Sequence, residues 1–243
     1  MALVLNEDQQ LLKDSAKSFC QQNAPVSQLR RLRDSDDAKG FDADTWQQMA
    51  ALGWAGMAIP EEYGGYGFGY GGLGVVLEET GRSLVSSPLI PTVLLGASTI
   101  NELGSERQKL ELLPKIVEGE LLLAMAIDET TFHAPTKLNT TATKSGENFK
   151  LNGSKTFVLD GHIADKLIVV ARTSGESDSA NGISLFLVDP ASAGVEISRS
   201  HMVDSRNSSK IIFTDVEVFA DNLLGDVGNG AAGLTRVLDR ACI

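Results

Sequence analysis

The sequence predicts a segregated α+β fold, with an N-terminal helical bundle, then an antiparallel β-barrel domain, then the start of a further helix. Up to residue 120, apolar residues recur at helical spacing. From Leu121 the period changes to two, and Gly, Asn and Ser separate the apolar runs. After Gly228-Asn229-Gly230 the helical pattern returns. Helices followed by strands favour separate layers, so the predicted domains are residues 1–120, 121–227 and 228–243.

Capping signals divide the helical half. Asn6 and Ser105 each have a Gln three residues later, which predicts two capping boxes. Asp42 is the predicted N-cap of another helix, which ends at Gly53. Pro114 is expected to kink or break the helix that contains it. Apolar residues predicted to face the core include Ala16, Phe19, Trp46, Met49, Leu73, Val76, Val93, Ile100 and Leu113.

Six runs of strand-forming residues follow the helices. They lie at 121–128, 138–144, 154–159, 166–173, 182–189 and 209–218. Asn152-Gly153 adopts positive φ at low cost, so we expect a tight hairpin turn there. The last helix opens at Ala231 and reaches Ile243; because an unpartnered helix of about a dozen residues is marginal, we expect a truncated chain.

Composition excludes several classes of function. The net charge of −11 argues against nucleic acid as a partner. No segment approaches the ~18 apolar residues of a membrane helix, and the N-terminus lacks a basic signal-peptide start, so we expect a cytoplasmic protein without a membrane span. Cys20 and Cys242 lie far apart, and the histidines at 133, 162 and 201 lack metal-like spacing, so no metal site is expected.

Five segments, in order, resemble acyl-CoA dehydrogenases. They are residues 60–67 (PEEYGGYG), 104–126 (from GSERQK to AMA), 151–161 (LNGSKTFVLDG), 206–218 (from RNS to FTDVEV) and 222–225 (NLLG). The resemblance implies an N-terminal α-domain and a middle β-barrel, without the family's C-terminal four-helix bundle. It further implies a flavoprotein oxidoreductase of fatty acid metabolism that desaturates an acyl-CoA thioester at the α,β position. An electron-transfer flavoprotein or a similar acceptor, and a homo- or hetero-oligomer, are the implied partners.

The resemblance also implies FAD as the cofactor and places a set of residues beside it: Met125, Ile127, Asp128, Phe157, Val158 and Leu159. Three of these depart from the family pattern. Asp128 stands where the family has a neutral Thr, and an ionised carboxylate cannot donate a hydrogen bond. Phe157 replaces a Trp and keeps an aromatic face without the indole N–H. Leu159 replaces a hydroxyl residue and lacks its hydrogen-bond donor, so we expect these departures to weaken FAD binding by this chain.

The catalytic base of the family is a carboxylate that removes the proton α to the thioester. In most members it lies in the C-terminal bundle, outside this chain, so the chain alone is expected to be inactive. A few members carry it on the first helix of that bundle just before an Arg, which here corresponds to Asp239 beside Arg240. Asp239 is therefore a candidate base, with a surface or capping carboxylate as the alternative, and Arg240 a candidate substrate contact. Misplacement of a base by about 1 Å can cost about a hundredfold in rate.

Two other functions remain open at this point. One is a non-catalytic partner subunit of a hetero-oligomeric acyl-CoA dehydrogenase, because some branches pair a competent subunit with a degenerate one. The other is a flavin-dependent oxidase or monooxygenase on the same scaffold. Lys155 and Arg172 are candidates for contacting an adenylate or pyrophosphate, although strand ends also commonly carry solvated charges.

Overall fold

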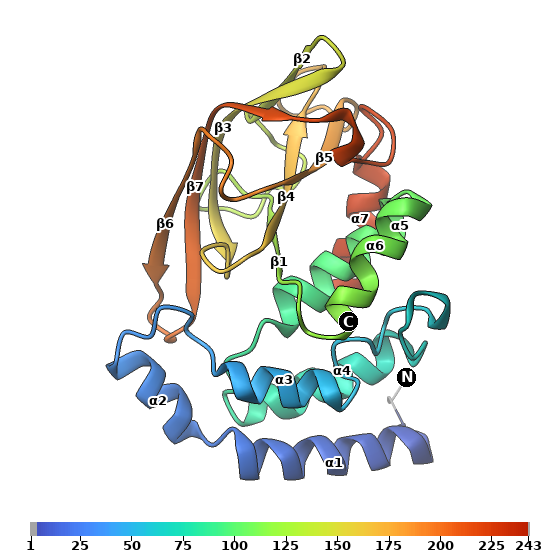
Figure 1. Ribbon diagram of the computed structural model, residues 1–243, viewed down its shortest axis with the longest axis vertical. Coiled ribbons are helices and arrows are strands. Elements are labelled where there is room, and N and C mark those ends of the chain that lie inside the picture. The colour runs from blue at the N-terminus through green and yellow to red at the C-terminus, as the bar shows by residue number, and fades with distance from the viewer. Residues whose placement is uncertain (1–3, 243) are drawn as a thin grey trace.

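Helices and strands occupy separate parts of the molecule, which confirms the predicted fold class (Figure 1). The computed structural model describes residues 4–242; residues 1–3 of the first predicted domain and Ile243 of the third lie outside the described residues. The first part contains α1 (Glu7–Asn23), α2 (Val26–Asp34), α3 (Ala43–Ala51), η1 (Glu61–Tyr63), α4 (Gly69–Arg82), η2 (Leu89–Ala97), α5 (Ser98–Leu103) and α6 (Glu106–Val117). No helix within residues 4–242 combines the length and apolar character needed to cross a membrane.

The helix ends follow the predicted capping signals. Both capping boxes are present, with Asn6 capping α1 and Ser105 capping α6, and the Asp42 side chain accepts from the first turn of α3. The predicted break at Pro114 is wrong, because α6 continues through it to Val117. Proline removes a single N–H donor, and here it does so in the last turn of a helix whose apolar face is buried.

The strands form one eight-stranded sheet in the order β6-β7-β3-β2-β4-β5-β8, with β1 paired to β4. Most pairings are antiparallel, but β1–β4 and β2–β4 are parallel. Sequence patterns missed β6 and β8. The strands are β1 (Leu123–Ala126), β2 (Thr141–Ser145), β3 (Asn148–Leu159), β4 (Lys166–Arg172), β5 (Ile183–Val188), β6 (Val195–His201), β7 (Asn207–Val218) and β8 (Leu223–Leu224), with η3 (Ala220–Asn222) before β8.

The hairpin turn predicted at Asn152-Gly153 is wrong. These residues lie inside β3, and the turn between β2 and β3 is at Gly146-Glu147. Opposite them β7 carries an extra residue, and the Asn152 side chain exchanges two hydrogen bonds with Asp215. A Cβ on Gly153 would lie 2.7 Å from the Thr140 Cα. The glycine therefore permits close approach of two chain segments rather than a turn.

Two apolar cores lie on the two faces of the sheet. One face encloses an interior core, which includes Leu167 and Val169 of β4. The other face packs against the helices and contributes Ile168 and Val170 to a second core. Because β4 and β5 are buried on both faces, they are nearly continuous apolar runs rather than alternating ones.

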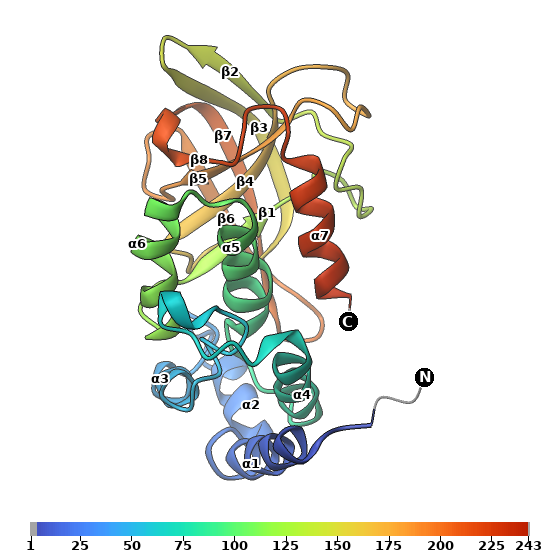
Figure 2. The same ribbon diagram turned by 90° about the vertical axis from the view of Figure 1, so that its right-hand side faces the viewer.

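The final helix, α7 (Ala231–Ala241), packs beside α5 (Figure 2). Leu234 and Val237 are buried in the contact. Glu102 of α5 accepts from Arg236 Nε at 2.5 Å and from Arg240 Nη1 at 2.7 Å. Burial raises the pKa of Glu102, but the two arginines more than offset it, so the carboxyl pKa lies below its ordinary value. Apolar packing and an ion-pair cluster thus hold α7.

Candidate functional site

A cavity of about 190 Å³ lies between the helix-facing side of the sheet and two helices. We call its two sides the sheet wall (Met125, Ile127, Asp128, His133, Phe157 and Leu159) and the helix wall (Pro91 and Leu95 of η2 and Leu238 of α7). Met125 belongs to the core between the sheet and the helices. The cavity therefore lies where the sheet and the helices meet. The cavity collects all but one of the residues that the sequence placed beside a cofactor.

Val158 is the exception. Its side chain is 1% exposed and belongs to the interior core of the sheet. It therefore points to the face opposite Phe157 and Leu159, as alternation along a strand requires. A role for the Val158 side chain in lining the cavity does not fit this geometry.

The orientation of Phe157 results from a β-bulge. Lys155 pairs with Ile211 and Val158 with Ser209, so β3 uses three steps where β7 uses two. The extra residue lets Lys155 and Val158 both point inward, and Phe157, which an unbroken strand would turn inward with Lys155, faces outward with 56% of its surface exposed. Phe157 has φ of 55°. This left-handed conformation costs about 1–2 kcal/mol for a residue with a side chain, and sequence patterns gave no signal for it.

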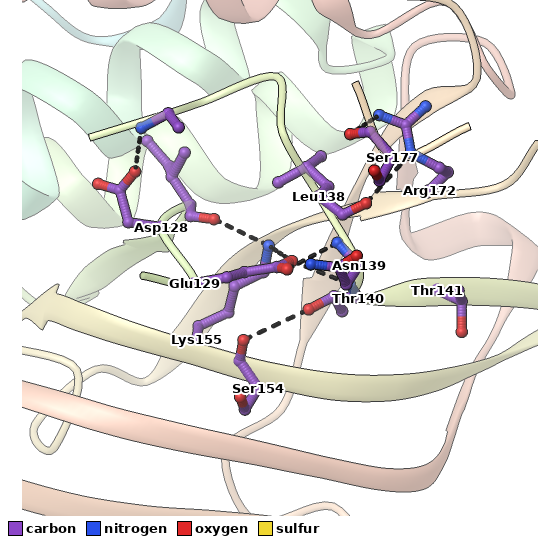
Figure 3. A network of polar contacts seen from close by, with 12 residues as sticks. Asp128, Glu129, Leu138, Asn139, Thr140, Thr141, Ser154, Lys155, Arg172 and Ser177 are labelled. Atoms are coloured by element: carbon purple, nitrogen blue, oxygen red, sulfur yellow. Dashed lines mark hydrogen bonds and ion pairs between the residues drawn. The ribbon is translucent and has the colours of Figure 1, made fainter. Parts of the chain in front are cut away.

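A buried ion pair supports the sheet wall from behind (Figure 3). Lys155 is fully buried, and its Nζ donates to Glu129 Oε1 at 2.9 Å and to the Ile127 carbonyl at 2.8 Å. Glu129 also accepts from the backbone N–H groups of Asn139 and Thr140, at 2.6 and 2.9 Å. Lys155 thus ties the segment after β1 to the middle of β3.

Burial shifts the pKa values of both Lys155 and Glu129. Desolvation lowers the pKa of Lys155 to about 8, although the Glu129 charge acts in the opposite direction. For Glu129, burial raises the pKa, but the Lys155 charge and the hydrogen bonds lower it overall. Neither reading of Lys155 from the sequence, a solvated charge or a phosphate contact, fits a fully buried, paired ammonium. The sequence reading also missed Glu129, which lies 26 residues from its partner.

Arg172 also has a structural role. Its guanidinium is almost buried and donates to six backbone carbonyls in the two loops that flank it: Thr136, Leu138, Ser174, Ser177, Ser179 and Asn181. These contacts use the donors of its planar group. Arg172 is therefore engaged with the protein rather than available for a pyrophosphate or for solvent.

Asp128 does not face the cavity as a free carboxylate. Its Oδ2 lies 2.9 Å from His133 Nδ1, and its Oδ1 accepts from the Ala134 N–H at 3.0 Å. Its backbone carbonyl accepts from Thr156 N–H at 2.7 Å, which joins the segment to the bulge of β3. Both carboxylate oxygens are thus engaged by the following loop.

Asp239 and Arg240 lie on α7 at the edge of this region. Asp239 is exposed, and it is the preceding residue, Leu238, that lines the cavity. Arg240 pairs with Glu102 and lies 5.5 Å from the Tyr70 ring centroid. A base that removes a weakly acidic proton benefits from burial, which Asp239 lacks in this chain. The roles assigned to both residues from the sequence remain predictions.

The cavity suits one flat ring system. Its walls are mostly apolar, Phe157 offers an aromatic face, and Asp128 and His133 supply polar groups. Its volume of about 190 Å³ is below the roughly 300–1,000 Å³ typical of pockets that enclose a whole cofactor. The residues present therefore fit the isoalloxazine ring of a flavin, and the rest of a dinucleotide would lie outside the cavity.

Comparison with known families gives two adjacent matches. Residues 6–120 match the model "Acyl-CoA dehydrogenase, N-terminal domain", and residues 124–216 match "Acyl-CoA dehydrogenase, middle domain". The mitochondrial isovaleryl-CoA dehydrogenase of Bos taurus is 33% identical over 97% of this chain and 56% of its own length. The matched boundary between the two models coincides with the change from helices to strands.

Solved structures show the same arrangement. Butyryl-CoA dehydrogenase from Megasphaera elsdenii superposes with a TM-score of 0.83 at 29% identity, covering 99% of this chain and 64% of that one. The ChsE4-ChsE5 complex from Mycobacterium tuberculosis gives a TM-score of 0.83 at 25% identity, covering 99% of this chain and 61% of the other. The chain spans between about half and two thirds of the length of these proteins.

Proposed function

This chain belongs to the acyl-CoA dehydrogenase family, and from that premise we propose that it is the N-terminal and middle part of a FAD-dependent oxidoreductase that desaturates an acyl-CoA thioester at the α,β position. The observation that carries the proposal is the cavity in which Phe157, Leu159 and Met125 meet η2 and α7. Within this proposal, residues 1–120 and 121–227 are the two domains, and 228–243 begin a third.

The residues of the cavity have distinct parts in such a reaction. Bound FAD would supply the acceptor for the hydride of the β-carbon. Phe157 would lie against the ring face, and the side chains of Met125, Leu159 and Leu238 would exclude water from it. The buried Lys155–Glu129 pair would keep the sheet wall rigid without touching the substrate.

Of the groups that the reaction needs, the base that removes the proton is the one for which this chain has the weakest candidate. Asp239 is exposed and lies on the outer side of α7, next to the residue that reaches the cavity. We therefore propose that the chain by itself does not desaturate acyl-CoA. Acyl-CoA, an electron-transfer flavoprotein or similar acceptor, and further subunits of the same or a homologous chain are the proposed partners.

A non-catalytic partner subunit is the second candidate. The observation that favours it is the loss of hydroxyl donors in the sheet wall, because Leu159 has no polar group and both oxygens of Asp128 accept hydrogen bonds from the 129–134 loop. The similarity to a complex named for two components, ChsE4 and ChsE5, is consistent with this reading.

Purification with FAD distinguishes the two candidates. The chain is purified alone with added FAD, and again after co-expression with a homologous acyl-CoA dehydrogenase subunit. Visible flavin absorbance in the chain alone supports the enzyme, and absorbance only after co-expression supports the partner subunit. Absorbance in neither sample would contradict both. Anaerobic bleaching by an acyl-CoA, in whichever sample is coloured, tests the proposed reaction.

A further inference from the structure

The polar side chains at the cavity are those of Asp128 and His133. The other side chains that line it are apolar: Pro91, Leu95, Met125, Ile127, Phe157, Leu159 and Leu238. A flat heteroaromatic ring in this space presents a polar edge of ring nitrogens and carbonyl oxygens. Burying such an edge without hydrogen bonds is unfavourable. The side chains able to satisfy it, within the described residues that line the cavity, are therefore this pair.

Asp128 is committed to other contacts. Its Oδ1 accepts from the Ala134 N–H at 3.0 Å and its Oδ2 contacts His133 Nδ1 at 2.9 Å. An ionised carboxylate only accepts hydrogen bonds, so the Nδ1 of His133 carries the proton in this contact. The carboxylate thereby fixes both the tautomer and the ring orientation of the histidine, as second partners of functional histidines commonly do.

The other ring nitrogen of His133 remains available. Among residues 4–242, Nε2 of His133 has no hydrogen-bond partner, and the side chain is 60% exposed while still lining the cavity. The loop that carries it is shaped locally, because Thr130 Oγ1 bonds to both the carbonyl and the N–H of Phe132. The imidazole is thus held at one nitrogen and open at the other.

We propose that His133, oriented by Asp128, binds the polar edge of the flavin ring through Nε2. The proposal rests on the proposed function, because the ring it concerns is that of FAD. Neutral imidazole offers Nε2 as an acceptor and imidazolium offers it as a donor, so the contact accommodates either kind of polar atom. Asp128 acts through His133 as a positioning residue.

The test measures binding of lumiflavin, which is the bare ring system, and of FAD by quenching of flavin fluorescence. His133→Leu is expected to weaken lumiflavin binding about tenfold, the loss of roughly one hydrogen bond to a buried polar group. His201→Leu is the matched control, because His201 is also exposed and also faces an aspartate, with 3.4 Å between its Nε2 and Asp36 Oδ1. That control should bind lumiflavin as the wild type does.

A double-mutant cycle tests the positioning role. Asp128→Ala should weaken lumiflavin binding in the wild-type background and have little further effect in the His133→Leu background. A further loss of the same size in the His133→Leu background would show that Asp128 acts on the ring independently, and would overturn the positioning claim.

A second readout does not depend on the folding of any variant. In the wild type, imidazole ¹⁵N shifts are followed as lumiflavin is added, and the Nε2 resonance of His133 should move while Nδ1 moves little. Lumiflavin binding without that shift, or binding unchanged in His133→Leu, overturns the inference and leaves the proposed function standing. Absence of both lumiflavin and FAD binding to the wild type overturns both.

Discussion

The two walls of the cavity are built differently. The sheet wall is braced from inside by the ion pair between the fully buried Lys155 and Glu129, whose side chain is 7% exposed, and is shaped by a bulge that turns Phe157 outward. The helix wall depends on η2 and on α7, which is held by the partly exposed cluster of Glu102, Arg236 and Arg240. The difference indicates that the sheet wall is held by buried groups within the sheet itself, whereas the helix wall depends on the packing and the partly exposed ion pairs that hold α7.

The largest expected effect comes from removing the brace. Lys155→Met leaves Glu129 buried without its counter-charge and should lower the free energy of unfolding by about 3–5 kcal/mol. Urea denaturation measures it, with Lys150→Met on the exposed face of the same strand as the control. Pairing Lys155→Met with Glu129→Gln should recover part of the loss. Equal stability of Lys155→Met and Lys150→Met would show that the brace is unimportant.

The carboxyl group of Asp160 should make the free energy of unfolding depend on pH. Asp160 directly follows β3, and burial raises its pKa from 3.8 to about 7, against the opposing charges of Arg206 and Arg199. Between about pH 4 and about pH 7 the Asp160 carboxyl therefore holds a proton in the folded state that it releases in the unfolded state. The free energy of unfolding falls as the pH rises from about 4 to about 7, and it does not recover above about pH 7. Asp160→Asn should remove about 1–3 kcal/mol of this fall. Urea denaturation across that range measures it, and the exposed Asp226→Asn should keep the wild-type profile.

The helix wall should loosen with a smaller change. Glu102→Gln weakens the contacts to Arg236 and Arg240 and should destabilise by about 1 kcal/mol or less, because the cluster is partly exposed. Hydrogen exchange should become faster in α7 and stay unchanged in β3. The exposed Glu118→Gln is the control. Faster exchange in β3 as well would show that the two walls are not independent.

The smallest effect on stability is expected at Phe157, which is 56% exposed. Phe157 has φ of 55°, so Phe157→Gly relieves backbone strain while it removes little buried surface. Its free energy of unfolding should stay within about 1 kcal/mol of the wild type. A loss of several kcal/mol in urea denaturation would mean that Phe157 is core rather than a cavity wall.

Sequence patterns predicted the elements whose causes are local. The caps at Asn6, Asp42 and Ser105 and the apolar strand β4 depend on neighbours a few residues away or on burial of a whole run. β6 was missed because none of its residues is buried and polar residues lie along much of its length. Asn152-Gly153 was misread because the same residues that favour a turn also permit close strand contacts.

The sequence predicted candidate site residues only in the segments that resemble the family. The predicted residues Met125, Ile127, Asp128, Phe157 and Leu159 line one cavity, and their proposed contact with a cofactor stays a prediction. The contribution of His133, Leu238 and Leu95 depends on how a loop and two helices fold onto the sheet, and the Glu129–Lys155 pair depends on a contact between distant segments. Such contacts carry no periodic signal in the chain.

Binding of a flavin ring against Phe157 is tested most directly by a lumiflavin titration of three proteins: the wild type, Phe157→Gly and Phe219→Gly. Phe219 is the matched control, since it is 59% exposed against 56% for Phe157 and does not line the cavity. We expect saturable binding to the wild type and to Phe219→Gly, and at least about fivefold weaker binding to Phe157→Gly, since stacking on an aromatic ring contributes about 1–3 kcal/mol. Equal binding to all three proteins, or to none, would contradict this expectation.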